Sequence, residues 1–141
     1  MIFYFDTSAL IKLVLAEPGS DLAWELWSGV AVNVSSVLAY PEGRAALAAA
    51  RRSGRLNAGL YRKSLLNFEK TYEEMLSIEV DDLLAIFAGE QAESFGLRGA
   101  DAIHLATALG LSDEEVTFVT WDQDQADAAS SAGLAVAGAP V

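Results

Sequence analysis

Residues 1–13, MIFYFDTSALIKL, place four large apolar side chains directly before Asp6-Thr7-Ser8 and the start of a helical pattern. The run 2–5 predicts a short buried strand, and the residues from 8 onward predict a helix that follows at once. An acid at the end of a buried strand has two interpretations: Asp6 caps the helix, or it belongs to a functional site. The choice depends on where the other acids lie.

Strands and helices alternate along the rest of the chain. Strand-like segments at 30–34, 76–80, 116–120 and 134–138 are interspersed with helical patterns near 8–16, 20–29, 36–53, 57–75, 81–96, 99–111 and 122–133. Pro41 indicates a kink in the third helix or a later start. The order predicts one α/β domain over 1–141, with three α/β/α layers and a central, mainly parallel sheet of four to five strands. Functional side chains in such sheets gather at the carboxyl ends of the strands.

Composition excludes several classes of protein. The chain has 141 residues, is 52% hydrophobic and contains no cysteine. It is therefore long enough to bury a core, has neither disulfides nor thiolate zinc sites, and suits a reducing compartment. No apolar run approaches the roughly 20 residues that span a bilayer, and MIFYFD lacks the basic region of a signal peptide. We expect a cytoplasmic protein.

The net charge of −11 argues against extensive nucleic-acid binding, but the charges are segregated. Glu69 is the only acid between residues 44 and 70, so this segment carries 7 − 1 = +6 and the remainder carries 2 − 19 = −17. The seven basic residues of the segment are Arg44, Arg51, Arg52, Arg55, Arg62, Lys63 and Lys70. The segment is either an ordinary solvated helical face or a contact surface for RNA or an acidic partner.

Four acids fall where they can converge at one end of the sheet. Asp6 and Asp122 each follow a predicted strand. Asp101 lies in GADAIHLATALGL, which has so few polar side chains that the helix should be largely buried, and a buried carboxylate is costly unless it is compensated. Glu42 shares a helical face with three alanines, which predicts that this face packs inward. Helix capping remains an alternative for Asp6 and Asp122.

Carboxylates so close together would repel one another unless a cation lay between them. Oxygen ligands without cysteine, beside the chain's one histidine, favour hard metals such as Mg²⁺ or Mn²⁺. Such a metal activates water and neutralises the charge that develops on a phosphodiester. The four acids therefore predict phosphodiester hydrolysis.

Four segments carry a resemblance to a known family: FDTSALIKL, SSVLAYPEGRAAL, LRGADAIHLATA and FVTWDQDQADAA. In order and spacing they resemble the motifs of PIN-domain ribonucleases, and most closely toxins of the VapC type from toxin–antitoxin pairs. The resemblance implies a single PIN domain that acts as an Mg²⁺- or Mn²⁺-dependent endoribonuclease on structured RNA such as transfer RNA. It also implies a homodimer and a cognate VapB-like antitoxin that holds the enzyme inactive.

By position, the family's acidic quartet falls on Asp6, Glu42, Asp101 and Asp122. Asp6, Asp101 and Asp122 are the expected metal ligands; Glu42 binds the metal or orients the water, and Asp124 is a second candidate for the fourth acid. The supporting and contact residues that we expect are Thr7, Ser8 and Thr120 beside the acids, with Ser8 or Thr7 as helix cap, and Arg44, Arg51, Arg52, Arg55 and Arg98 toward RNA or antitoxin.

Two residues near the acids are assigned to packing. We interpret His104 as a buried core histidine and Trp121 as a packing residue rather than a platform for a base. Two other functions remain as alternatives. A receiver-like signalling domain also binds Mg²⁺ with clustered acids, but it needs a lysine after a late strand, and the chain has none after Lys70. A PIN fold kept as an inactive binding or scaffold protein is the second.

Overall fold

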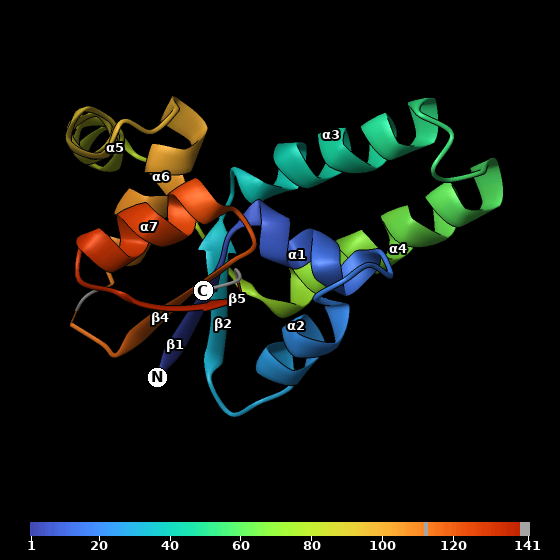
Figure 1. The fold of residues 1–141 in the computed structure, drawn as a ribbon, viewed down its shortest axis with the longest axis horizontal. Helices are drawn as coiled ribbons and strands as arrows, with labels where there is room; N and C mark the ends of the chain where they lie inside the picture. Colours follow the sequence, from blue (N-terminus) through green and yellow to red (C-terminus); the bar gives the residue numbers. More distant parts are fainter. Residues whose placement is uncertain (112, 139–141) are drawn as a thin grey trace.

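A computed structural model describes residues 1–111 and 113–138 (Figure 1). One sheet contains β1 (Ile2–Phe5), β2 (Val32–Ser36), β3 (Leu76–Ile78), β4 (Val116–Thr120) and β5 (Ala135–Gly138), in the order β3-β2-β1-β4-β5. Every neighbouring pair is parallel, which confirms the predicted fold class. Of the predicted domain 1–141, Ser112 and residues 139–141 lie outside the described residues.

Seven helices connect the strands within the described ranges: α1 (Thr7–Val14), α2 (Ser20–Trp27), α3 (Ala39–Arg52), α4 (Ala58–Glu74), α5 (Asp82–Phe95), α6 (Gly99–Leu109) and α7 (Gln123–Ser131). Helix α3 begins at Ala39 rather than at 36, and Ser35 and Ser36 complete β2. Pro41 therefore lies in the first turn, where a missing N–H costs nothing. No helix in the described parts of the chain is both long and apolar enough to cross a membrane.

Alternate side chains of the central strands enter two different cores, one on each face of the sheet. Tyr4 and Phe118 stack on one another, with ring centroids 5.3 Å apart, in the core that α6 and α7 cover. Phe5 and Val119 pack on the other face against α1 and α2. Figure 1 shows the resulting three layers, with α5, α6 and α7 grouped on one side of the sheet.

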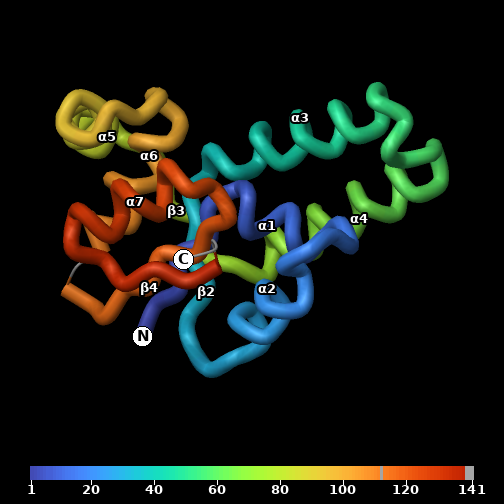
Figure 2. The backbone as a smooth tube through the Cα atoms, viewed as in Figure 1, coloured from blue at the N-terminus to red at the C-terminus, as the bar shows by residue number. Residues whose placement is uncertain are grey.

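Helices α3 and α4 form a hairpin that extends away from the sheet (Figures 1 and 2). The hairpin has a small core of its own, in which Leu47 and Phe68 are fully buried and which also includes Leu15 beyond the end of α1. Gly43 permits the close approach of the two helices, since a Cβ there would lie 2.2 Å from Cζ of Phe68.

The prediction that the alanine face of α3 packs inward is wrong. Ala45, Ala46 and Ala49 are exposed, and the buried residues are Ala39, Gly43, Leu47 and Ala50. The helix packs through the face that carries Gly43 because this is where α4 can approach it. Arg55 lies beyond the end of α3, in the turn that leads to α4.

Glu17 joins α1 to the turn between α3 and α4. Its carboxylate binds Lys12 at 3.0 Å and Arg55 at 2.5 Å. Partial burial by itself raises the pKa of Glu17, but the hydrogen bonds and charges of Arg55 and Lys12 outweigh burial and lower the pKa below its usual value. The ionised carboxylate therefore stabilises the folded state.

Because the pKa of Glu17 is lower in the folded than in the unfolded state, its contribution is complete above the unfolded pKa and disappears as the pH falls through the folded pKa. We expect Glu17→Gln to lower the free energy of unfolding by about 1 kcal/mol at pH 7. The difference from wild type should shrink as the pH falls below about 4. Urea unfolding at pH 7 and at pH 3 measures both. An equal difference at the two pH values would contradict this account.

Candidate active site

Asp6 lies at the carboxyl end of β1 and is only 3% exposed. Its Oδ1 accepts hydrogen bonds from the Ala9 amide and the Ser8 hydroxyl, and its Oδ2 accepts one from Thr120. Asp6 therefore caps α1 itself, so the expectation that Thr7 or Ser8 is the cap is wrong. The backbone of Asp6 is extended, as a cap requires, and its side chain reaches the free amide of Ala9.

Burial raises the pKa of Asp6, and this effect outweighs the charge of His104 and the hydrogen bonds from Ser8, Thr120 and the Ala9 amide, all of which lower it. Ionising the buried Asp6 therefore lowers the stability of the folded state, which a neutral side chain at this position would not do. Such a cost is typical of functional carboxylates.

Asp122 lies at the end of β4, next to β1 in the sheet, and is linked to Asp6 through Thr120. Its amide donates to Thr120 Oγ1 at 3.0 Å, while the same hydroxyl donates to Asp6. The side chain of Asp122 caps α7 by accepting the Gln125 amide at 3.1 Å. Asp124 lies one residue into α7 and is exposed. Capping and membership of the site thus coexist for Asp122, as they do for Asp6.

Glu42 faces the site from the first turn of α3. Its Oε1 accepts hydrogen bonds from Thr7 Oγ1 at 2.7 Å and from His104 Nε2 at 2.6 Å. Burial alone raises the pKa of Glu42, but the His104 hydrogen bond and charge, together with Thr7, lower it below its usual value. Glu42 is therefore ionised at neutral pH. The prediction that His104 is a buried residue is confirmed, although sequence reasoning missed its contact with Glu42.

Asp101 lies in the first turn of α6, as predicted, but its side chain is 19% exposed rather than buried. Arg98 Nε binds its Oδ2 at 3.2 Å, so an ion pair at the helix start compensates the carboxylate. Gln125 is 1% exposed, and its amide donates to the backbone carbonyl of Asp101 at 3.1 Å. Gln125 thereby links α7 to the start of α6. Its position three residues after Asp122 did not predict this contact.

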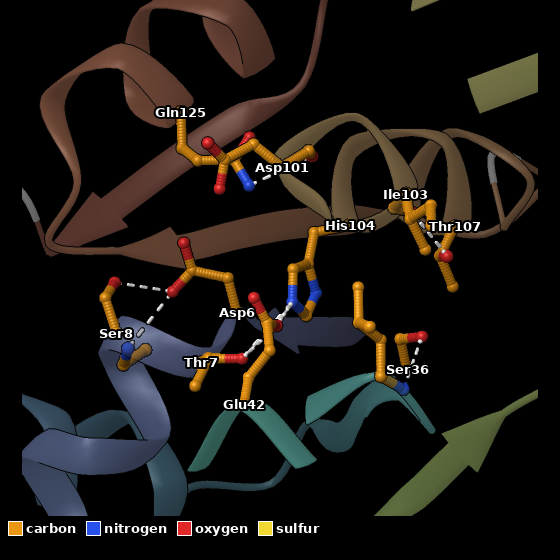
Figure 3. Close-up of polar contacts among 12 residues, drawn as sticks. Asp6, Thr7, Ser8, Ser36, Glu42, Asp101, Ile103, His104, Thr107 and Gln125 are labelled. Carbon is orange, nitrogen blue, oxygen red and sulfur yellow. Dashed lines mark hydrogen bonds and ion pairs between the residues drawn. The ribbon is translucent and has the colours of Figure 1, made fainter. Parts of the chain in front are cut away.

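Figure 3 shows Asp6, Glu42 and Asp101 approaching one region from three different elements. Within the described ranges, however, no three acidic or histidine side chains are arranged so that they could hold a metal ion as they stand. The predicted quartet is thus not gathered into a ligand group. Each carboxylate instead has its own hydrogen-bond donors.

The chemistry of the donors nevertheless fits a hard divalent cation. Every candidate ligand is a carboxylate. No hydrogen bond among the described residues uses Oε2 of Glu42, Oδ1 of Asp101 or Oδ2 of Asp122. These three oxygens remain available as ligands.

Trp121 packs against backbone on two sides, as predicted. A Cβ at Gly19 would lie 2.5 Å from its Nε1, and one at Gly138 would lie 3.1 Å from its Cζ3. Both glycines have positive φ angles, +99° and +106°, which other residues rarely adopt. The indole therefore serves to anchor the loop between α1 and α2 beside β5.

The candidate contact arginines lie apart from this centre. Arg44 and Arg55 are exposed and pair with Glu69 and Glu17. Arg51 and Arg52 are exposed at the end of α3, with no ion pair to any described residue. Arg98 pairs with Asp101 while its side chain stays 85% exposed.

The chain is an α/β protein in which acids follow two adjacent parallel strands and are linked through Thr120. Residues 3–130 match the family model described as PIN domain, so the chain belongs to the PIN-domain family. Family membership excludes the receiver-like alternative.

The relatives are of the VapC type. The chain is 42% identical over 140 residues to ribonuclease VapC45 from Mycobacterium tuberculosis (strain CDC 1551 / Oshkosh), an alignment that covers 96% of this chain and 94% of the relative. The solved structure of PAE2754 from Pyrobaculum aerophilum superimposes with a TM-score of 0.71 at 18% identity, covering 96% of this chain and 83% of that one. VapBC2 from Rickettsia felis, bound to a DNA fragment, gives 0.68 at 14% identity, covering 97% and 98%.

Proposed function

We propose that this protein is a divalent-metal-dependent endoribonuclease and the cytoplasmic toxin of a VapBC-type toxin–antitoxin pair. The observation that carries the proposal is the set of acids around the ends of β1 and β4, in a chain 42% identical to a ribonuclease. The inactive scaffold alternative is less favoured because Asp6 occupies a buried position that raises its pKa. An inactive scaffold would have no need of a carboxylate that destabilises the fold when it is ionised.

Asp6, Asp101 and Asp122 would hold Mg²⁺ or Mn²⁺, with Glu42 as a further ligand or as the group that orients water. Asp124 would replace Asp122 as the fourth acid only if the start of α7 moved, since Asp122 is the one joined to Thr120. A bound cation of this kind activates water and neutralises charge on the phosphodiester.

The chain's own residues would orient the reacting groups. Glu42 is ionised and holds Oε1 in two hydrogen bonds, so Oε2 is the atom that would accept a proton from the attacking water. Thr120 fixes the relative positions of Asp6 and Asp122 by donating to one and accepting from the backbone of the other. Ser8 restrains Asp6 from α1 and also accepts the Trp121 amide at 2.9 Å.

The proposal is tested by RNA cleavage with the antitoxin-free protein, on transfer RNA and ribosomal RNA, in EDTA, Mg²⁺ or Mn²⁺. We expect cleavage only with a metal, and a loss of more than about 100-fold in Asp101→Asn, because a lost ligand should cost more than the 10–100-fold typical of a lost supporting contact. Asp21→Asn is the matched control, since Asp21 also lies in the first turn of a helix, α2. Equal cleavage by wild type and Asp101→Asn, or undiminished cleavage in EDTA, would contradict the proposal.

We further propose that the tip of the α3–α4 hairpin binds the RNA backbone through Arg51 and Arg52, which are exposed and hold no ion pair to a described residue. Arg51→Ala with Arg52→Ala should weaken RNA binding and reduce the slope of log K against log salt by about one per arginine. Gln91→Glu with Ser94→Glu, on α5, changes the net charge equally and should have little effect. Unchanged RNA affinity in the double variant Arg51→Ala, Arg52→Ala would show that this segment is an ordinary solvated helical face.

The partner that we propose is a VapB-like antitoxin. VapBC2 of Rickettsia felis was solved as a complex with DNA. In this chain, three cavities of about 250, 380 and 360 Å³ adjoin α1: the first two share the lining residue Asn67, the second and third share Arg55, and the third reaches Thr7 and Ser8. Their walls combine apolar side chains with Arg55, Lys63 and Lys70, which suit an apolar, acidic segment, while Glu17 and Glu74 are the acids that line them. The product of a small neighbouring gene should stop RNA cleavage at a one-to-one ratio.

The second partner that we propose is another copy of this chain, in a homodimer. Light scattering would test the proposed homodimer.

A further inference from the structure

His104 is the only histidine of the chain, and both of its ring nitrogens are engaged. It is 2% exposed and comes from α6. Nδ1 lies 2.7 Å from the hydroxyl of Tyr4, which is fully buried in β1, and Nε2 lies 2.6 Å from Oε1 of Glu42. The imidazole thus connects the core of the sheet to a carboxylate of the candidate site (Figure 3).

When the imidazole is neutral, one assignment of protons satisfies all of these contacts. The Tyr4 hydroxyl donates to Nδ1, the Nε2–H group donates to Glu42 Oε1, and the Thr7 hydroxyl donates to the same oxygen. Thr7 Oγ1 also lies 3.2 Å from Nε2, so the three groups form a closed triangle. Oε1 of Glu42 then has two donors and Oε2 has none from the described residues.

Core packing alone does not require this arrangement. Glu42 extends from the face of α3 on which Ala45, Ala46 and Ala49 are exposed, so without His104 its side chain would be free to turn into solvent. The buried Tyr4–His104 pair instead holds the half-buried carboxylate in one orientation. The ring is itself restrained by an edge contact with Tyr4, at 5.8 Å between centroids.

We propose that His104 is a positioning residue which, backed by Tyr4 and helped by Thr7, fixes Glu42 so that Oε1 is occupied and only Oε2 is presented to the site. Glu42 would therefore serve the site through one oxygen, not two. The effect on catalysis rests on the proposed function, whereas the effect on Glu42 does not.

The single histidine allows a test that needs neither metal nor RNA. Long-range ¹H–¹⁵N spectra of the metal-free protein at pH 8 should show one imidazole, whose Nε2 shift moves in Glu42→Ala and whose Nδ1 shift moves in Tyr4→Phe. Asp21→Asn on α2 should move neither. Ring shifts that ignored both substitutions would overturn the proposal.

A double-mutant cycle separates positioning from a purely structural role. His104→Leu should weaken the binding of Mn²⁺ and lower kcat, each by about 10–100-fold, with little change in KM. His104→Gln, which keeps a donor on a planar amide, should recover part of both losses. In a Glu42→Ala background, His104→Leu should cause no further loss of Mn²⁺ affinity, although it still lowers Tm. Leu105→Val, a buried neighbour on α6, should lower Tm and leave Mn²⁺ binding unchanged.

If the losses of Mn²⁺ affinity from His104→Leu and Glu42→Ala multiplied in the double variant, His104 would act through the stability of the fold and not through Glu42. That result would overturn the proposal. A wild-type protein that did not cleave RNA would instead contradict the proposed function, while the ring shifts would still decide the role of His104.

Discussion

Asp6→Asn is expected to abolish RNA cleavage while the folded state becomes as stable as the wild type or more stable. Activity should fall by more than about 100-fold, because Asp6 is a proposed metal ligand and lies at the centre of the hydrogen bonds that join β1 to β4. Stability should not fall, since burial raises the pKa of Asp6 and an amide removes the cost of holding a charge there.

The side chain of asparagine also preserves the helix cap, because asparagine accepts an amide hydrogen bond at this position as well as aspartate does. Thermal unfolding and RNA cleavage, measured on the same preparation, give the two quantities. Asp81→Asn is the matched control: Asp81 caps α5 in the same way, at an exposed position. A stable Asp6→Asn variant with full activity would show that the carboxylate has no function, and a strongly destabilised one would show that its charge supports the fold.

Gly43→Ala is expected to destabilise the protein, although alanine is the better helix former by about 1 kcal/mol. The new Cβ would lie 2.2 Å from Cζ and 2.4 Å from Cε1 of Phe68, whose ring is fully buried between the two helices of the hairpin. Either the buried ring of Phe68 or one of the helices must shift, and overpacking of this kind costs about 1–3 kcal/mol. Because Glu42 is the neighbouring residue, its carboxylate should lose its alignment with His104, and RNA cleavage should fall as well.

Urea unfolding measures the change, and Gly89→Ala is the matched control. Gly89 lies in the interior of α5, and no side chain or distant backbone atom comes within 4 Å of a Cβ there. Its substitution should therefore stabilise the protein by about 0.5–1 kcal/mol. Phe68→Leu should relieve part of the loss in Gly43→Ala if the clash is its cause. A Gly43→Ala variant as stable as Gly89→Ala would mean that the ring of Phe68 moves at no cost.

Both predictions concern the way in which the fold supports the site. Asp6 and Asp122 come from adjacent parallel strands, so the backbone ladder of the sheet sets their separation. Glu42 and Asp101 come from helices, and their positions depend on how those helices pack. Glu42 and Asp101 are thus expected to be more sensitive than Asp6 and Asp122 to changes elsewhere in the chain.

The element order was predictable because it depends on local patterns. The run 2–5, the strand at 116–120 and the amphipathic segments between them carry periodicities that a single sequence displays. The rule that sites form at the carboxyl ends of parallel strands then leads to Asp6 and Asp122 without further information. The start of α3 was uncertain by three residues, since the effect of Pro41 depends on whether β2 continues through Ser36.

The side-chain partners were not predictable in the same way. His104 appeared to be an ordinary core residue because spacing alone could not place Tyr4 or Glu42 beside it. Asp101 appeared to be buried because its helix has few polar side chains, whereas it pairs with Arg98, three residues earlier. Gln125 gave no signal at all, although it is buried against the start of α6. The inward face of α3 was assigned to alanines on grounds of polarity, whereas the choice was made by the ring of Phe68 on another helix.

By itself, then, the sequence determined the α/β class, the order of the elements and the position of Asp6 and Asp122 after adjacent strands, because these depend on local periodicity and on the direction of each strand. Only the tertiary structure decided which groups satisfy each carboxylate: Thr120 for Asp6, His104 and Thr7 for Glu42, and Arg98 for Asp101. The physical reason is that a buried or half-buried charge takes whichever donors the packing brings within hydrogen-bond distance, and packing joins residues as far apart in the chain as Tyr4 and His104.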